Sequence, residues 1–226
     1  MTFDLNKSSN KLLILLLLAD LMFILIHVFH MMEFQPVKDP LFSVAQDFGY
    51  SEIYQYIKEY WIVVLLFMIA INRAHIIYFA WTVLYMYLLL DDSLEIHERL
   101  GRYLVKYFEI QPRFHLRAQD FGELSVSIFF GVLLFSFIGV AYLFSNGTAK
   151  RISKYLFILV MSVAFFGVIV DIIHTVMRWG RPIWELVEDG GEMLTMSIIV
   201  WYVFTLKFIP KCPGLEPKDA KAPSLS

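Results

Sequence analysis

The segment WIVVLLFMIAINRAHIIYFAWTVLYMYLLL, residues 61–90, decides the fold of this protein. Polar side chains interrupt it only at Asn72, Arg73, His75 and Thr82. As one straight helix it would extend about 45 Å, more than the roughly 30 Å of hydrocarbon that one crossing needs, and Arg73 would lie at mid-bilayer. A hairpin that turns at Asn72–Arg73 avoids both problems. We therefore predict two antiparallel membrane helices, over residues 53–72 and 74–98.

The composition of the whole chain agrees with membrane helices. Hydrophobic residues make up 58% of the 226 residues, charged residues only 18%, and the mean hydropathy is +0.62. A soluble domain carries about 25% charged residues. The formal net charge of −2 gives no electrostatic basis for binding nucleic acid. Cys212 is the only cysteine, which excludes an intrachain disulfide and a cysteine-based zinc motif.

The sequence contains four further apolar stretches, one before the hairpin and three after it, and together with the hairpin they form the predicted bundle. The first follows a short polar start but is longer than the apolar core of a signal peptide, and no small-residue cleavage site follows it. Ser145-Asn146-Gly147 and Trp179-Gly180-Arg181-Pro182 separate the later ones. The four helices are predicted over residues 12–32, 123–144, 153–177 and 182–208. The fold class is therefore all-α, a polytopic transmembrane helical bundle of about six helices in a single domain, with a flexible polar tail over 211–226.

Six crossings place nearly all the acidic residues at one end of this bundle. Of the 21 Asp and Glu residues, all but Asp4, Glu216 and Asp219 fall on the side where the first, third and fifth helices end. We call this side the acidic end. The ordinary explanation is that helix ends and loops are polar because they meet water. Four groups meet there whether or not the hairpin forms: Asp91-Asp92 through His97-Glu98, Asp120 with Glu123, Asp171 with His174, and Glu185 with Glu188, Asp189 and Glu192.

Two features of the later helices favour a binding site at this end. Asp171 lies about two turns inside its predicted helix, with His174 on the same stripe, and ionisable groups at that depth usually face the bundle interior. Glu188 and Glu192 are four residues apart on one helix face, where like charges repel each other. The positive N-terminal end of the helix offsets part of this repulsion, and a bound cation would offset more.

His97 is the third such feature. If the helix over 74–98 continues past the membrane surface, Asp91 and Glu95 lie on its solvent-facing side and His97 lies in the middle of its apolar side. The His97 ring is then expected to point into the protein. A histidine in that position is either a hydrogen-bonded core residue or a ligand, and both interpretations stay open.

Imidazole and carboxylate groups without thiolates are typical ligands of a divalent zinc, iron or manganese ion, which is the predicted cofactor. Asp171-x-x-His174 has the spacing of the Glu-x-x-His pairs in di-iron bundles. A three-histidine zinc site would instead use His97, His174 and one of His27 or His30. The predicted metal ligands are His97, Glu98, Asp171, His174, Glu188, Glu192, Asp91 and His27.

Two further segments have a structural and a functional interpretation. Gly190-Gly191 either allows tight helix packing or lets neighbouring glutamates approach a ligand. The basic segment over 99–117 is most simply a surface helix on lipid headgroups.

Two motifs carry a resemblance to known proteins. Asp91-Asp92-Ser93-Leu94-Glu95-Ile96-His97-Glu98 and Glu188-Asp189-Gly190-Gly191-Glu192-Met193 resemble a pattern in a group of uncharacterised bacterial multi-helix membrane proteins. The resemblance covers the predicted third to sixth helices and leaves the first two unmatched. It implies a membrane location and makes these residues site candidates, but it brings no function with it.

Three functional hypotheses follow. The first is a metal-dependent membrane enzyme, a hydrolase or oxidoreductase, that acts on a lipid-like substrate. The second is a transporter or ion-binding membrane protein that uses the same acidic end for a cation. The third is a structural or accessory membrane subunit whose charges form interhelical pairs with arginines such as Arg178, Arg181 and Arg99. The lipid bilayer is a partner in all three.

The orientation is predicted from the lysines and arginines near the ends of the spans. The two sides carry nearly equal numbers of the 19 Lys and Arg residues. Lys7 and Lys11 directly precede the first span, which usually dominates the orientation. We therefore expect a multi-pass protein of the bacterial inner membrane with both termini in the cytoplasm and the acidic end outside.

Overall fold

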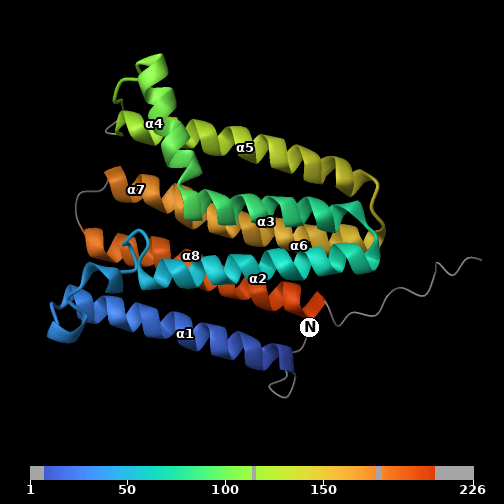
Figure 1. Ribbon diagram of the computed structural model, residues 1–226, viewed down its shortest axis with the longest axis horizontal. Helices are drawn as coiled ribbons and strands as arrows, with labels where there is room; N and C mark the ends of the chain where they lie inside the picture. The colour runs from blue at the N-terminus through green and yellow to red at the C-terminus, as the bar shows by residue number, and fades with distance from the viewer. Residues whose placement is uncertain (1–7, 114–115, 177–179, 207–226) are drawn as a thin grey trace, which may run out of the picture.

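The computed structural model describes residues 8–113, 116–176 and 180–206, apart from the side chains of 174–176, 181 and 182. Over these residues the fold is all-α (Figure 1). The helices are α1 (Ser8–Met31), α2 (Tyr50–Arg73), α3 (Ile76–Leu94), α4 (Ile96–Phe108), α5 (Ala118–Leu143), α6 (Gly147–Ala164), α7 (Asp171–Val176) and α8 (Arg181–Leu206). The predicted tail over 211–226 lies outside the described residues.

Among the described residues, five helical segments are long and apolar enough to cross a membrane. They are Ser8–Met31, Tyr50–Arg73, Ile76–Leu94, Ala118–Leu143 and Gly147–Ile173. Figure 1 shows that they run side by side in alternating directions, with α8 among them. α8 packs against α1, α2 and α6. The protein is therefore a multi-pass membrane protein, and its fold class is the predicted one.

The turn between α2 and α3 has the form of the expected hairpin. α2 ends at Arg73, Ala74 adopts a left-handed conformation with φ of 51°, and α3 begins at Ile76. The Arg73 guanidinium donates a 2.8 Å hydrogen bond to the carbonyl of Leu206 at the end of α8. A cation at a helix C-terminus is favourable because the last carbonyls carry partial negative charge. The hairpin thus places Arg73 at the membrane boundary rather than at its centre.

The third helix is shorter than the predicted helix over 74–98. α3 ends at Leu94, and Glu95 takes a left-handed conformation with φ of 53°. The Asp91 carboxylate accepts a 2.8 Å hydrogen bond from the backbone N–H of His97 in the first turn of α4. Asp91 is therefore buried, at 7% exposure, and the expectation that it faces solvent is wrong. A helix that restarts here needs a side-chain acceptor for its first amides, and Asp91 supplies one.

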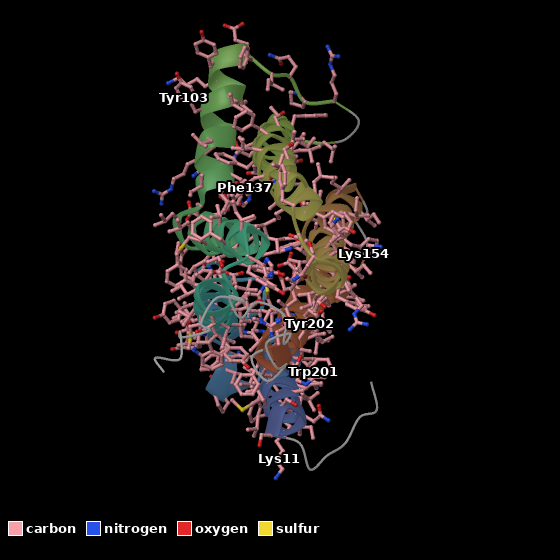
Figure 2. All side chains as sticks on the ribbon, turned by 90° about the vertical axis from the view of Figure 1, so that its right-hand side faces the viewer. Lys11, Tyr103, Phe137, Lys154, Trp201 and Tyr202 are labelled. Carbon is pink, nitrogen blue, oxygen red and sulfur yellow. The ribbon has the colours of Figure 1, made fainter. Side chains whose placement is uncertain are left out.

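After this break, α4 turns away from the bundle direction and crosses α5 (Figure 1). The crossing is close because two glycines face each other: a Cβ on Gly101 would lie 2.7 Å from the backbone nitrogen of Glu123, next to Gly122. Tyr103, Tyr107 and Phe108 on α4 are exposed. Figure 2 views the bundle close to end-on and shows Tyr103 on α4, away from the packed helices.

The predicted helix over 153–177 is interrupted by a π-helical turn. α6 changes into this turn over Phe165–Val170 before α7 begins at Asp171. π-turns inside helices occur frequently at functional sites. This one packs against α8. The interruption therefore lies opposite the Gly190-Gly191-Glu192 sequence.

The apolar core lies between α2, α3, α6 and α8. Its largest fully buried apolar and aromatic side chains include Trp81, Tyr78, Leu66, Leu156 and Ile199. Within it, the Trp81 indole donates a hydrogen bond to the Ser153 hydroxyl at 2.8 Å. This core holds the helices that surround the acidic end.

Candidate functional site

A cavity of about 170 Å³ opens at the acidic end of the bundle. It lies between the connection from α1 to α2, the start of α2, the α3–α4 junction and α8. We call it the acidic pocket. Its lining residues are Val44, Ala45, Gln46, Asp47, Ser51, Glu52, Gln55, Tyr56, Asp91, Asp92, Glu95, His97, Glu98, Asp189, Glu192 and Met193.

The charges that line the pocket are strongly unbalanced. Eight of its residues carry carboxyl groups, one is a histidine, and none is a lysine or arginine. Three carboxylates have basic partners, because Glu95 and Glu98 bind arginines on α4 and Asp91 binds His97. Among the described residues, no Lys, Arg or His lies within ion-pair distance of the other five: Asp47, Glu52, Asp92, Asp189 and Glu192.

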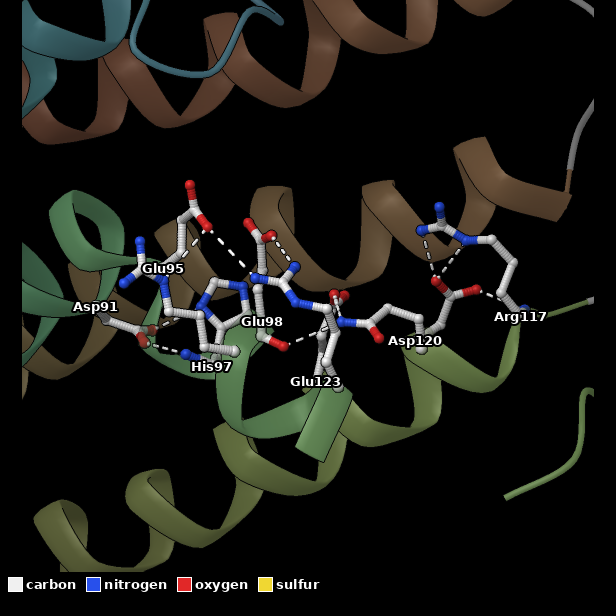
Figure 3. A network of polar contacts seen from close by, with 10 residues as sticks. Asp91, Glu95, His97, Glu98, Arg117, Asp120 and Glu123 are labelled. Atoms are coloured by element: carbon white, nitrogen blue, oxygen red, sulfur yellow. Dashed lines mark hydrogen bonds and ion pairs between the residues drawn. The ribbon is translucent and has the colours of Figure 1, made fainter. Parts of the chain in front are cut away.

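His97 and Asp91 form a pair at the α3–α4 junction (Figure 3). The Nδ1 atom of His97 lies 3.0 Å from the Asp91 carboxylate. Burial lowers the pKa of His97, but the hydrogen bond and negative charge of Asp91 outweigh it, so the pKa is raised above its usual value. Since Asp91 holds Nδ1, Nε2 is the ring nitrogen available to a ligand in the pocket.

A chain of polar contacts fixes this wall of the pocket to α5 (Figure 3). Arg102 donates to Glu98 at 3.2 Å on α4. The Gln119 amide donates to the Glu98 carbonyl at 3.1 Å and to the Glu123 carboxylate at 2.7 Å. Farther along, Arg117 binds Asp120 at 2.7 Å, within the first turn of α5. Of these contacts, the bond from Gln119 to Glu98 joins α5 to α4, the helix that carries His97.

Two acceptors on α2 are buried without a hydrogen-bond partner. The side chain of Gln55 lines the pocket, is 9% exposed, and its Oε1 atom has no donor. Glu59, one turn farther along α2, is fully buried and neither carboxyl oxygen has a donor. The pocket residues Asp92 and Glu192 act on the Glu59 carboxyl group electrostatically. Buried acceptors without donors are rare in folded proteins, so Gln55 and Glu59 each call for a donor from outside, such as a water molecule or a bound group.

A buried ion pair lies deeper in the membrane core. Lys58 and Asp20 are both 0% exposed and are 3.2 Å apart. The Lys58 ammonium also donates to the Met193 carbonyl at 2.7 Å and to the Ser197 hydroxyl at 3.4 Å. The pair thus joins α1, α2 and α8. Our sequence analysis missed Lys58 because it lies in the polar first turns of α2, where a lysine is expected to reach water.

Glu192 connects the acidic pocket with the π-helical turn. Its carboxylate lies against Gly167, in the space that a Cβ on that residue would fill. The ring of Phe166 covers Gly191 in the same way. The glycines of α8 and of the turn therefore allow a close approach, which agrees with both interpretations of Gly190-Gly191.

The structure brings only some of the predicted metal ligands together. His97, Glu98, Asp91 and Glu192 line the pocket, whereas Asp171, Glu188 and His27 do not. The charges of Asp171 and Glu188 still act on Glu192. The side chain of His174 lies outside the described residues. Over the part of the chain that the structure describes, no three His, Cys, Asp or Glu side chains are arranged to hold a metal ion.

His27 lies outside the pocket lining and contacts the connection between α1 and α2. It is 1% exposed, and its Nδ1 accepts a 3.2 Å hydrogen bond from the backbone N–H of Val44. Because Nδ1 accepts, the proton of the neutral ring lies on Nε2, and this buried nitrogen has no hydrogen-bond partner among the described residues. His27 therefore holds the α1–α2 connection that forms one wall of the pocket.

The chain belongs to a family described as a domain of unknown function (DUF8692), which matches residues 12–208. The match covers α1 from residue 12 onward, the other four apolar spans and every residue of the acidic pocket. No curated protein and no solved structure matches the chain.

Proposed function

We propose that this membrane protein binds a cation in the acidic pocket, as a transporter or an ion-binding protein. One observation carries the proposal: five carboxylates without a basic partner and the unpartnered Gln55 acceptor surround a single cavity. Carboxylates close together in a partly buried space repel each other and are costly to desolvate. A bound cation would remove both costs.

The dimensions of the cavity suit a small ligand. At roughly 30 Å³ for each water molecule, 170 Å³ corresponds to about five or six waters. Pockets for drug-sized molecules are about 300–1,000 Å³. A small cation, bare or with part of its hydration shell, matches the available space.

The pair of His97 and Asp91 favours a second candidate, the metal-dependent membrane enzyme with a lipid-like substrate. Metal-binding histidines usually donate their other ring N–H to a carboxylate, which fixes the ring. His97 and Asp91 have this relationship at the edge of the pocket. A zinc, iron or manganese ion held by His97 Nε2 would need carboxylates such as Glu98 and Glu192 to move closer. Metal content below about 0.2 ions per chain after mild purification would count against this enzyme.

Cation binding is tested by thermal unfolding of the purified protein in detergent, followed by tryptophan fluorescence. Na⁺, Mg²⁺, Mn²⁺ and organic ammonium ions are added in turn. A ligand at 100 times its Kd stabilises the native state by about 2.7 kcal/mol, which raises the Tm by several degrees. We expect such a rise with at least one of these cations, and a much smaller rise in the Asp92→Asn and Glu192→Gln variants.

The matched control is Glu109→Gln, an exposed glutamate at the end of α4 that does not line the pocket. It should respond to the cation like the unmodified protein. If none of the cations raises the Tm, or if Glu109→Gln loses the response as well, cation binding in the pocket is disproved. Uptake of the stabilising cation into proteoliposomes separates a transporter from a protein that only binds.

The orientation belongs to the same proposal. We expect both termini in the cytoplasm of a bacterial cell and the acidic pocket open to the outside. Fusions of alkaline phosphatase test this arrangement: the enzyme should be inactive at the C-terminus and active in the connection after α4.

A further inference from the structure

The acidic pocket presents mainly hydrogen-bond acceptors, and three of its side-chain donors are already used within the protein. The Tyr56 hydroxyl donates to the Asp92 carbonyl at 3.1 Å. The Ser51 hydroxyl lies within 3.5 Å of two backbone carbonyls of the α1–α2 connection. The Gln46 amide donates to the Asp47 carbonyl at 3.1 Å. Most of what remains for a ligand is acceptors, the carboxylates and the Gln55 oxygen, so a ligand that brings donors fits this lining best.

The carboxylates without a basic partner come from separate elements rather than one point. Asp47 lies on the α1–α2 connection, Glu52 lies in the first turn of α2, Asp92 lies near the end of α3, and Asp189 and Glu192 lie on one face of α8. A dehydrated metal ion needs its ligands within about 2.0–2.6 Å of one centre. The described residues contain no such arrangement. A ligand whose positive charge is divided between two positions matches the distribution better.

We propose that the ligand of the acidic pocket is a short organic diammonium ion, an aliphatic chain with an amine at each end; this inference rests on the proposed cation binding. Each ammonium group carries three donors and no acceptor, which is complementary to carboxylates and to an amide oxygen. Hydrogen bonds between charged groups are roughly twice as strong as neutral ones. Met193 and Val44 supply apolar surface in the lining for the methylene groups.

Gln55 is the observation that separates this site from a merely solvated acidic surface. A carboxylate on a surface is satisfied by water, but the Gln55 oxygen is buried and has no donor. Glu59 one turn deeper is in the same state. An ammonium group in the pocket would supply the donor that Gln55 lacks, because this side chain is part of the lining.

The test is isothermal titration calorimetry on the full chain in detergent with four probes. These are 1,4-diaminobutane, n-butylamine with one ammonium group, tetramethylammonium with a charge but no N–H donor, and Mn²⁺. We expect 1,4-diaminobutane to bind at least about tenfold more tightly than n-butylamine, because a second set of charged hydrogen bonds is made. Tetramethylammonium should not bind measurably.

Variants connect the binding to the named residues. Glu192→Gln and Gln55→Met should each weaken 1,4-diaminobutane binding about tenfold, and Glu109→Gln should leave it unchanged. If either buried variant fails to fold, Asp47→Asn carries the test, because Asp47 is exposed on the α1–α2 connection and still lines the pocket. Its melting temperature without ligand should equal that of the unmodified protein.

The outcomes separate this inference from the proposed function. If Mn²⁺ binds in the pocket and 1,4-diaminobutane does not, cation binding stands and the diammonium ligand is disproved. Equal affinities for the diamine and n-butylamine also disprove it, because one charge would then be enough. If no probe binds, both proposals fail.

Discussion

Two charged regions of the molecule differ in how their charged groups are partnered. They are the buried pair of Lys58 and Asp20, and the acidic pocket. In the membrane core, the Lys58 ammonium has three acceptors within 3.4 Å, on Asp20, Met193 and Ser197. In the pocket, five carboxylates have no basic partner among the described residues. The ammonium group of the first region is surrounded by protein acceptors, whereas the carboxylates of the second have no protein cation beside them in the described part of the chain.

This difference shows how a structural charge is told apart from a functional one. Both members of an ion pair inside a bundle are needed for stability. Removing either one leaves the other charged without a partner in a low-dielectric medium. Unpaired like charges in a cavity weaken the fold, so their presence indicates a ligand that compensates for them. The predictions below test whether the two regions differ in this way.

The largest effect is expected for Lys58→Met, which leaves Asp20 buried without its partner. Breaking a buried ion pair typically costs about 3–5 kcal/mol of unfolding free energy. Unfolding of the variant in detergent micelles should show a loss of that size. Asp92→Asn in the pocket should instead leave the stability of the ligand-free protein unchanged or raise it, because it removes one of several like charges.

The double variant Lys58→Met with Asp20→Leu serves as the control. Replacing both members of a buried pair with apolar residues is often neutral. The double variant should therefore recover most of the stability. If it is no more stable than Lys58→Met alone, the loss does not come from an unpaired Asp20.

A smaller effect is expected for Gly167→Ala in the π-helical turn. The new methyl group would take the place of the Glu192 carboxylate, and such overpacking costs about 1–3 kcal/mol. Both thermal stability and cation binding should decrease, because Glu192 lines the pocket.

Gly131→Ala on α5 is the matched control, since nothing lies within 4 Å of a Cβ there. Alanine is favoured over glycine in a helix by about 1 kcal/mol, so this variant should be at least as stable as the unmodified protein. Equal stabilities for the two alanine variants would mean that Glu192 does not depend on the space at Gly167.

The smallest effect concerns the pH dependence of the pair formed by His97 and Asp91. Since the pKa of His97 is raised in the folded protein, its stabilisation is complete below about pH 6.5 and is lost as the pH rises through the folded pKa. The contribution should be about 1 kcal/mol, because the His97 side chain is partly exposed. Thermal unfolding from pH 5 to 9 measures it.

Asp91→Asn removes the charge from this pair and should flatten the pH dependence. The same titration of Glu109→Gln provides the reference. An unchanged profile in Asp91→Asn would assign the pH dependence to other groups.

Several features of the molecule could be predicted from the sequence because they depend on local patterns. The length of the apolar run over 61–90 requires a turn, and the turn lies at Ala74, next to the predicted position. The parity of the crossings brings the acidic segments to one end, where Asp91, His97, Glu98 and Glu192 meet in one pocket. The length of an apolar run and the spacing of acidic segments are fixed by the sequence, so folding does not change them.

Other features depended on tertiary contacts. At the break at Glu95, Asp91 turns back to accept from the His97 amide in the first turn of α4, and no periodicity signals this contact. The π-helical turn forms where Glu192 packs against Gly167, a contact between residues from two helices. The sequence also made Asp171 and His27 equal candidates with Glu192, although neither lines the pocket.

The sequence by itself therefore determined that this protein crosses the membrane several times with its acids gathered at one end. Only the tertiary structure decided which acids share a cavity and which find a partner. The reason is physical. The length and number of the apolar segments follow from the order of residues along the chain, whereas the pairing of a charge depends on side chains that other helices bring to it. Lys58 shows this most clearly, since Asp20, Met193 and Ser197 come to it from two different helices.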